Sequence, residues 1–251
     1  KQEEGLAPYR HMLENILRQK AHVLSEEQEE ILAMAGDMAQ TPDNVFRMLN
    51  NADIKFPVIR DENGEEVEIT HSRFLTLMES KDRTVRKNAF EGLYHTYANQ
   101  KNTLAAILNG SVKKDVFYAR VRKYGSALEA ALDADNVPVE VYDKLIETVH
   151  RYLPVMHRYV ALRKKALKLD EIHMYDLYTP IVQDYEIKAS YEQAVEMVKE
   201  GLKPLGQEYG RILDEAFRNH WVDVYENKGK TSGAYSWGAY GTHPYVLLNY
   251  E

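Results

Sequence analysis

The chain has 251 residues, 44% of them hydrophobic, so it can bury the core of one large domain or two small ones. Its net charge is −7 with acidic and basic residues interspersed, and this pattern argues against nucleic acid or an anionic membrane as a partner. It contains no cysteine, which excludes disulfides and thiolate zinc sites and is compatible with the cytoplasmic location that we expect.

Helix signals recur along most of the chain. Starts are predicted near Leu6, at Ser25 with the capping pattern "SEEQ", within "TPDNVFRML" at 41–49, near Ser190 and near Pro204. Between them, "IKFPVIRDENGEEVEIT" at 54–70 has the features of a hairpin that turns at Asn63–Gly64. No apolar run approaches the roughly 20 residues that a membrane helix needs. The predicted class is mainly α with minor β.

Two segments are long enough to raise a question of length. Residues 81–124 could be helical throughout and would then extend roughly 65 Å, more than a compact domain of this size accommodates. We therefore expect either a break at Gly92 or Gly110 or support from a larger body. Residues 138–168 show apolar side chains at steps of three and four, which predicts one amphipathic helix with a kink at Pro154.

Two catalytic patterns are present only in part. Glu147 and His150 have the E-x-x-H spacing of a di-iron helix, but no second such helix is found, so a solvated helix surface is the alternative. Ser236 lies in "AYSWG", which imitates a nucleophile elbow, yet the following residues predict loop and strand rather than helix, which favours a turn serine. The zinc-protease pattern HExxH is absent from the chain.

The last stretch, "GKTSGAYSWGAYGTHPYVLLNYE" at 229–251, alternates glycines with large rings. Pro244 favours extended backbone at His243, whose ring could face a cleft or be merely structural. The run "YVLLNY" at 245–250 is apolar at successive positions, which is typical of an interior strand of a small sheet. The pattern alone leaves the role of this stretch open.

The run from Trp221 to Glu251, together with "HMYDLYTPIV" at 173–182, resembles the oligoendopeptidase F branch of the thimet-type zinc metallopeptidases. The resemblance implies a multi-helix scaffold at 1–170, with its hairpin near 54–70. It also implies the start of a zincin-like catalytic region at 171–251, ending at an edge strand at 245–250 that borders the substrate cleft. The residues implied in substrate binding are Gly241, Thr242, His243 and Tyr245.

The family's reaction is zinc-dependent cleavage of internal bonds in short peptides, and its HExxH helix would lie beyond Glu251. The resemblance therefore implies an internal fragment that supplies scaffold and one cleft wall, with no catalytic or metal-binding residue of its own. Alone it is expected to be inactive and free of zinc. Its implied partners are short peptide substrates and the remaining C-terminal catalytic half of the parent enzyme. The competing interpretation is a non-catalytic helical module that binds a peptide or protein through the aromatic stretch.

Overall fold

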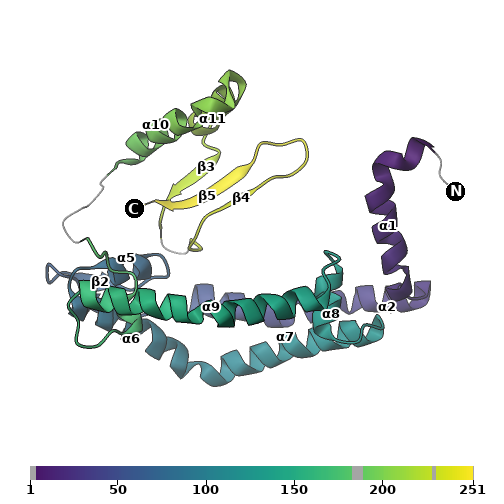
Figure 1. Ribbon diagram of the computed structural model, residues 1–251, viewed down its shortest axis with the longest axis horizontal. Coiled ribbons are helices and arrows are strands. Elements are labelled where there is room, and N and C mark those ends of the chain that lie inside the picture. Colours follow the sequence, from purple (N-terminus) through teal and green to yellow (C-terminus); the bar gives the residue numbers. More distant parts are fainter. Residues whose placement is uncertain (1–3, 183–188, 228–229, 251) are drawn as a thin grey trace. The chain divides into compact units, whose positions relative to one another are not determined.

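The computed structural model describes residues 4–182, 189–227 and 230–250 and is mainly helical with two small sheets, as the sequence predicts (Figure 1). The chain forms two compact units, each built from two chain segments. The first comprises 1–53 and 99–161, and the second comprises 54–98 and 162–251. The expected boundary near residue 170 remains a prediction. Among the described residues, no helix is long and apolar enough to cross a bilayer.

The first unit is helical. Its α-helices are α1 (Arg10–Gln19), α2 (Glu26–Met34), α3 (Gly36–Ala39), α4 (Thr41–Met48), α7 (Lys101–Val121), α8 (Ala127–Asp133) and most of α9 (Val139–Ala166). The predicted cap is present, because Ser25 and Gln28 form a capping box at the start of α2. Helix α4 packs along α7, where a Cβ placed on Gly110 would lie 3.1 Å from the side chain of Pro42. Gly110 thus permits close approach of two helices and ends neither.

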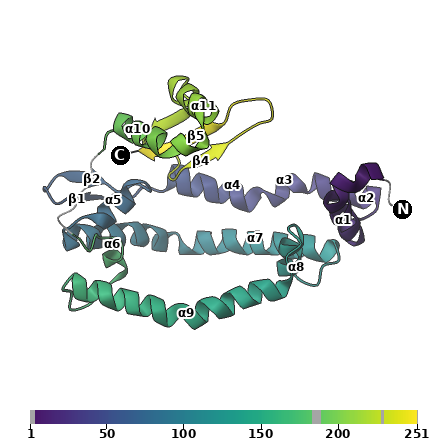
Figure 2. The same ribbon diagram turned by 45° about the horizontal axis from the view of Figure 1, so that its top comes forward.

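The long segment 81–124 is interrupted at Gln100, between α6 (Arg83–Asn99) and α7. The expectation of a break at Gly92 or Gly110 is wrong. Gly92 lies inside α6, and a Cβ there would come within 2.9 Å of both Ile69 and Pro57. The glycine is therefore explained by packing against neighbours that are distant in sequence. Pro154 lies inside α9 without ending it, and the α9 ribbon bends along its length in Figure 2.

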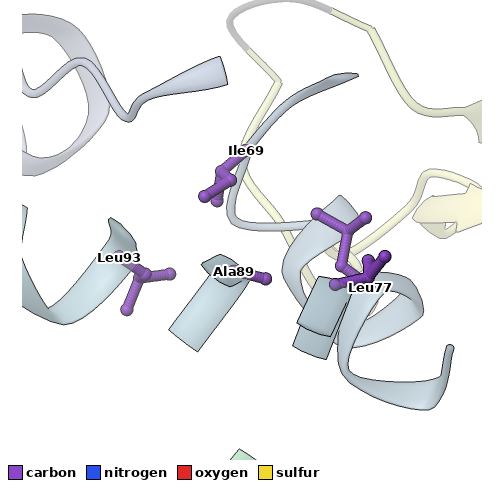
Figure 3. Close-up of a cluster of buried hydrophobic side chains, with 5 residues drawn as sticks. Ile69, Leu77, Ala89 and Leu93 are labelled. Carbon is purple, nitrogen blue, oxygen red and sulfur yellow. The ribbon is translucent and has the colours of Figure 1, made fainter. Parts of the chain in front are cut away.

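The second unit begins with the predicted hairpin, in which β1 (Val58–Arg60) pairs antiparallel with β2 (Glu66–Glu68). Gly64 has a φ of +84°, as its place in the turn requires. Helices α5 (Arg73–Glu79) and α6 follow and form the buried core with the residue after β2. Figure 3 shows this core, whose members are Ile69, Leu77, Val85, Ala89 and Leu93.

A buried ionic cluster fixes the segment that contains "HMYDLYTP". Asp176 has no exposed side-chain surface, and its two carboxylate oxygens accept four hydrogen bonds: two from Arg83, one from Arg86 and one from the His173 N–H, at 2.9–3.1 Å. Burial by itself would raise the pKa of the Asp176 carboxyl, but the hydrogen bonds from the two arginines outweigh it and lower that pKa. Arg163 of α9 donates to the carbonyl of Asp176 as well. The segment is thereby tied to α6 and α9.

Candidate functional site

The C-terminal part of the second unit consists of two helices followed by a three-stranded sheet. The helices are α10 (Tyr191–Leu202) and α11 (Gln207–Arg218), and the strands are β3 (Val222–Tyr225), β4 (Tyr235–Trp237) and β5 (Tyr245–Tyr250). Helix α10 begins after Ser190 as predicted, with Ser190 as its cap, whereas Pro204 lies in a short 3-10 turn before α11. Figures 1 and 2 both show the helix pair beside the sheet.

The strand order is β3-β5-β4, with β5 parallel to β3 and antiparallel to β4. The expectation of an edge strand at 245–250, which came from the family resemblance, is therefore wrong. The continuous apolar pattern of "YVLLNY" had already indicated an interior strand. The structure agrees with that pattern, because β5 pairs with β3 on one side and with β4 on the other. Among the described residues, the outer strands of this sheet are β3 and β4.

The backbone of Ser236 faces the free side of β4. In the register, Ser236 lies opposite Val246 of β5, but the Val246 N–H donates at 2.9 Å to the carbonyl of Trp221, on the β3 side. In an antiparallel pair, a residue that turns its N–H away from its neighbour belongs to a non-hydrogen-bonded pair. Ser236 therefore points both its N–H and its C=O outward. Ser236 is therefore a strand residue, and the expectation that it lies in a turn is wrong.

A tight bend connects β4 to β5 and contains the first two of the expected substrate-binding residues. Gly241 has a φ of +84°, a conformation that favours glycine, and a Cβ there would meet no atom within 4 Å. The Thr242 N–H donates to the carbonyl of Ala239 at 3.1 Å, and the Thr242 hydroxyl lies 3.0 Å from that carbonyl and 3.1 Å from the carbonyl of His243. Both polar groups of Thr242 thus contribute to the bend.

His243 and Tyr245 lie together beside Trp221. The imidazole of His243 stacks on the Trp221 indole with 4.8 Å between centroids and 7° between planes, and Tyr245 approaches it at 4.7 Å. His243 Nδ1 lies 2.9 Å from the carbonyl of Pro244, which can only accept, so Nδ1 carries the proton and Nε2 of the neutral ring is an acceptor. The structure brings these two expected residues together on a common aromatic support.

The sheet face toward the helices is apolar. A cavity of about 460 Å³ lies between α10, α11 and the sheet, and its lining includes Trp221, Val222, Pro244 and Val246. Large rings occupy exposed positions elsewhere: Trp237 is 71% exposed, Tyr235 is 56% exposed, and Tyr240 at the bend is fully exposed. The indole of Trp221 thus belongs to the lining of this cavity and also stacks on the His243 ring.

Within residues 4–182, 189–227 and 230–250, no three His, Asp or Glu side chains are grouped so that they could hold a metal ion. Glu147 on α9 instead pairs with Lys144 and Arg151, which matches the solvated-surface alternative for the E-x-x-H pattern. The described residues offer a strand edge and aromatic side chains rather than a metal centre.

Sequence reasoning missed two features of this site. The outward backbone of Ser236 follows from strand order, which no local pattern encodes. The contact of Trp221 with His243 joins positions 22 residues apart; the aromatic enrichment of the stretch was its only signal.

Comparison with known proteins gives consistent matches over the chain. Relatives include "Oligopeptidase PepF" of Bacillus subtilis (strain 168), 55% identical over 250 residues that cover 100% of this chain and 37% of that protein. A second is "Group B oligopeptidase PepB" of Streptococcus agalactiae serotype III (strain NEM316), 46% identical over 98% of this chain and 41% of the relative. The crystal structure of oligoendopeptidase-F from Enterococcus faecium matches with a TM-score of 0.69 and 44% identity, over 87% of this chain and 41% of that one.

The chain thus spans about two fifths of the length of these relatives. Two family models match it: "Oligopeptidase F" over residues 1–56 and "Peptidase family M3" over residues 76–251. The second covers well over half of the chain, and therefore the chain belongs to peptidase family M3.

Proposed function

We propose that this chain is part of a zinc-dependent oligoendopeptidase that hydrolyses internal bonds of short peptides, and that it supplies helical scaffold and one wall of the substrate cleft. Membership of peptidase family M3 and the similarity to proteins named as oligopeptidases support the reaction class. The observation that carries the role of this chain is the outer side of β4, where the Ser236 N–H and C=O point away from β5.

An extended peptide can add to such an edge as a further strand, held by main-chain hydrogen bonds. Ser236 would donate its N–H to the peptide and accept from it through its C=O. Tyr235 and Trp237 alternate with Ser236, so their rings share one face of the sheet and would flank the bound peptide. Because these contacts use backbone groups, they favour peptides as a class over any single sequence.

The four residues of the bend and of β5 have different roles in this proposal. Gly241 and Thr242 shape the bend that leads into β5, whereas His243 and Tyr245 offer an acceptor nitrogen and a hydroxyl. A hydrogen bond to peptide from either side chain is worth about 0.5–1.5 kcal/mol net, so losing one should reduce catalytic efficiency roughly three- to tenfold.

Zinc does not fit the residues described here, which contain no cluster of suitable ligands. In this proposal the ion is held by the remaining catalytic half of the protein, which is the second partner beside the peptide. We also propose a cytoplasmic location, which the absence of cysteine favours.

Two substitutions at one position test the β4 edge in the full-length protein. Ser236→Pro removes the outward N–H, and proline is tolerated on edge strands whose N–H faces solvent, so the sheet should persist. Ser236→Ala keeps the backbone and serves as the matched control. With a fluorogenic oligopeptide and zinc present, we expect Ser236→Pro to raise KM about fivefold or more and Ser236→Ala to leave it near the original value.

Equal KM for both variants, at equal thermal midpoints, would remove β4 from peptide binding. Peptide binding by the full-length protein without any zinc-dependent cleavage would instead support the non-catalytic binding module.

A further inference from the structure

The strand β4 is too short to fix its own position. It has three residues, pairs with β5 at three positions and is exposed throughout. Its place depends on how the chain enters it from the preceding segment, residues 230–234. Two side chains, Lys230 and Asn249, hold that segment against the sheet.

Asn249 of β5 contacts the segment at two carbonyls. Its Nδ2 donates to the carbonyl of Gly233 at 2.7 Å and to that of Thr231 at 3.1 Å. Both partners only accept, so the amide nitrogen must face them, and Oδ1 on the opposite side is buried without a donor among the described residues. The amide orientation is set by the segment that it holds.

The register shows why a side chain performs this task. Tyr235 lies opposite Leu247, so two residues further back Gly233 would lie opposite Asn249. Gly233 has a φ of +95°, which departs from strand geometry, so backbone pairing cannot continue there. The Asn249 side chain replaces it and joins the sheet to the carbonyls just before β4.

Lys230 holds the other end of the segment to β3. Its side chain is only 4% exposed, and Nζ lies 2.7 Å from the carbonyl of Tyr225, 3.3 Å from that of Asp223 and 3.1 Å from the Asp223 carboxylate. The three donors of the ammonium group therefore each have an acceptor. A buried cation needs such satisfaction, so a neutral side chain of similar length would not hold the segment in the same way.

We propose that Asn249, with Lys230, is a positioning residue that sets the place and register of β4 and thereby the peptide-binding edge. We call the contacts that Asn249 and Lys230 make with the sheet and with residues 230–234 the clamp. Its consequence for peptide binding rests on the proposed function, whereas its effect on the place of β4 does not. Neither side chain needs to touch the peptide.

Hydrogen exchange in the full-length protein separates this role from general stability. The Tyr235 and Trp237 amides face β5 in the register, whereas the Val246 amide donates to Trp221 and reports the pairing of β5 with β3. Asn249→Asp keeps the shape but places a carboxylate oxygen against the two carbonyls. We expect it to speed exchange of the Tyr235 and Trp237 amides about tenfold and to leave that of Val246 unchanged.

Asn219→Asp, at the exposed end of α11, adds the same charge as a matched control and should change none of these rates. Lys230→Met should reproduce the effect of Asn249→Asp, and Lys230→Arg should restore slow exchange in part. Kinetics with the fluorogenic oligopeptide should show a raised KM with a smaller change in kcat.

Unchanged exchange at Tyr235 and Trp237 in both Asn249→Asp and Lys230→Met would overturn the clamp. Equal acceleration at Val246, with a lowered thermal midpoint, would also overturn it, because the residues would then stabilise the whole sheet. Faster exchange confined to β4 with an unchanged KM would support the clamp and contradict the proposed use of β4 in peptide binding.

Discussion

The buried carboxylate of Asp176 offers a sharp test of what stabilises the second unit. Asp176→Asn preserves the side-chain shape but replaces one acceptor oxygen by a donor nitrogen. Each carboxylate oxygen accepts two hydrogen bonds, so in either orientation the new nitrogen would face two donors. It also leaves Arg86, whose side chain is 4% exposed, without its buried counter-charge.

Removing one partner of a buried ion pair costs about 3–5 kcal/mol, and we expect the lower end because one acceptor remains. With a urea dependence near 2 kcal/mol per M, the midpoint should fall by about 1.5 M. Trp221 and Trp237 both belong to the second unit, so their fluorescence reports its unfolding.

The control is Glu91→Gln on α6, the helix that carries Arg86. It breaks an exposed pair with Lys87 and should change stability by less than about 0.5 kcal/mol. An Asp176→Asn midpoint no lower than that of the control would refute the role of the cluster.

The same cluster predicts a dependence on pH. The folded-state pKa of Asp176 is lowered from its unfolded value, which is about 3.9, so its stabilisation is complete above that value. The stabilisation is lost as the pH falls through the lower folded-state pKa. The stability difference between the original protein and Asp176→Asn should therefore narrow as the pH falls below about 3.9 toward the folded-state pKa. A stability difference that stays constant as the pH falls would contradict the conclusion that the Asp176 carboxyl is ionised in the folded protein.

Three further predictions concern backbone, packing and the candidate site. Gly241→Ala should cost about 1 kcal/mol because its φ is +84°, whereas Gly238→Ala, at a position with ordinary φ and open space, should be nearly neutral; urea unfolding compares them. Gly92→Ala should destabilise the second unit by about 1–3 kcal/mol, since its Cβ would come within 2.9 Å of two side chains, and a neutral result would show that they can move apart. His243→Ala and Tyr245→Phe should each lower kcat/KM for an oligopeptide roughly three- to tenfold; unchanged kinetics in both would make them structural residues.

Local signals in the sequence predicted local structure well. The capping box predicted at Ser25 is present, a helix begins after Ser190, and the hairpin turns at Asn63–Gly64. Each of these features depends on residues within a few positions of one another. The apolar run at 245–250 likewise indicated a strand with neighbours on both sides, which the strand order confirms.

Features set by contacts between distant segments could not be predicted in this way. Gly92 suggested a helix break, but α6 continues through it. The absence of a side chain at Gly92 leaves room for Ile69 to pack against the helix. Asp176 and Arg86 are 90 positions apart, and no local pattern connects them. The same limit applies to Ser236, whose outward backbone follows only once β4 is placed beside β5. The substrate-binding residues expected in this stretch stay a prediction, whereas the strand at 245–250, expected at the edge of the sheet, lies between β3 and β4.

The most direct test of the central claim is amide exchange at Ser236 of the full-length protein, with and without a non-hydrolysable oligopeptide. Peptide addition to the β4 edge predicts that the Ser236 amide, which points away from β5, becomes protected while the Val246 amide keeps its rate. Saturating peptide that leaves the Ser236 amide unprotected would contradict the claim that this chain supplies the substrate-binding strand edge of an M3 peptidase.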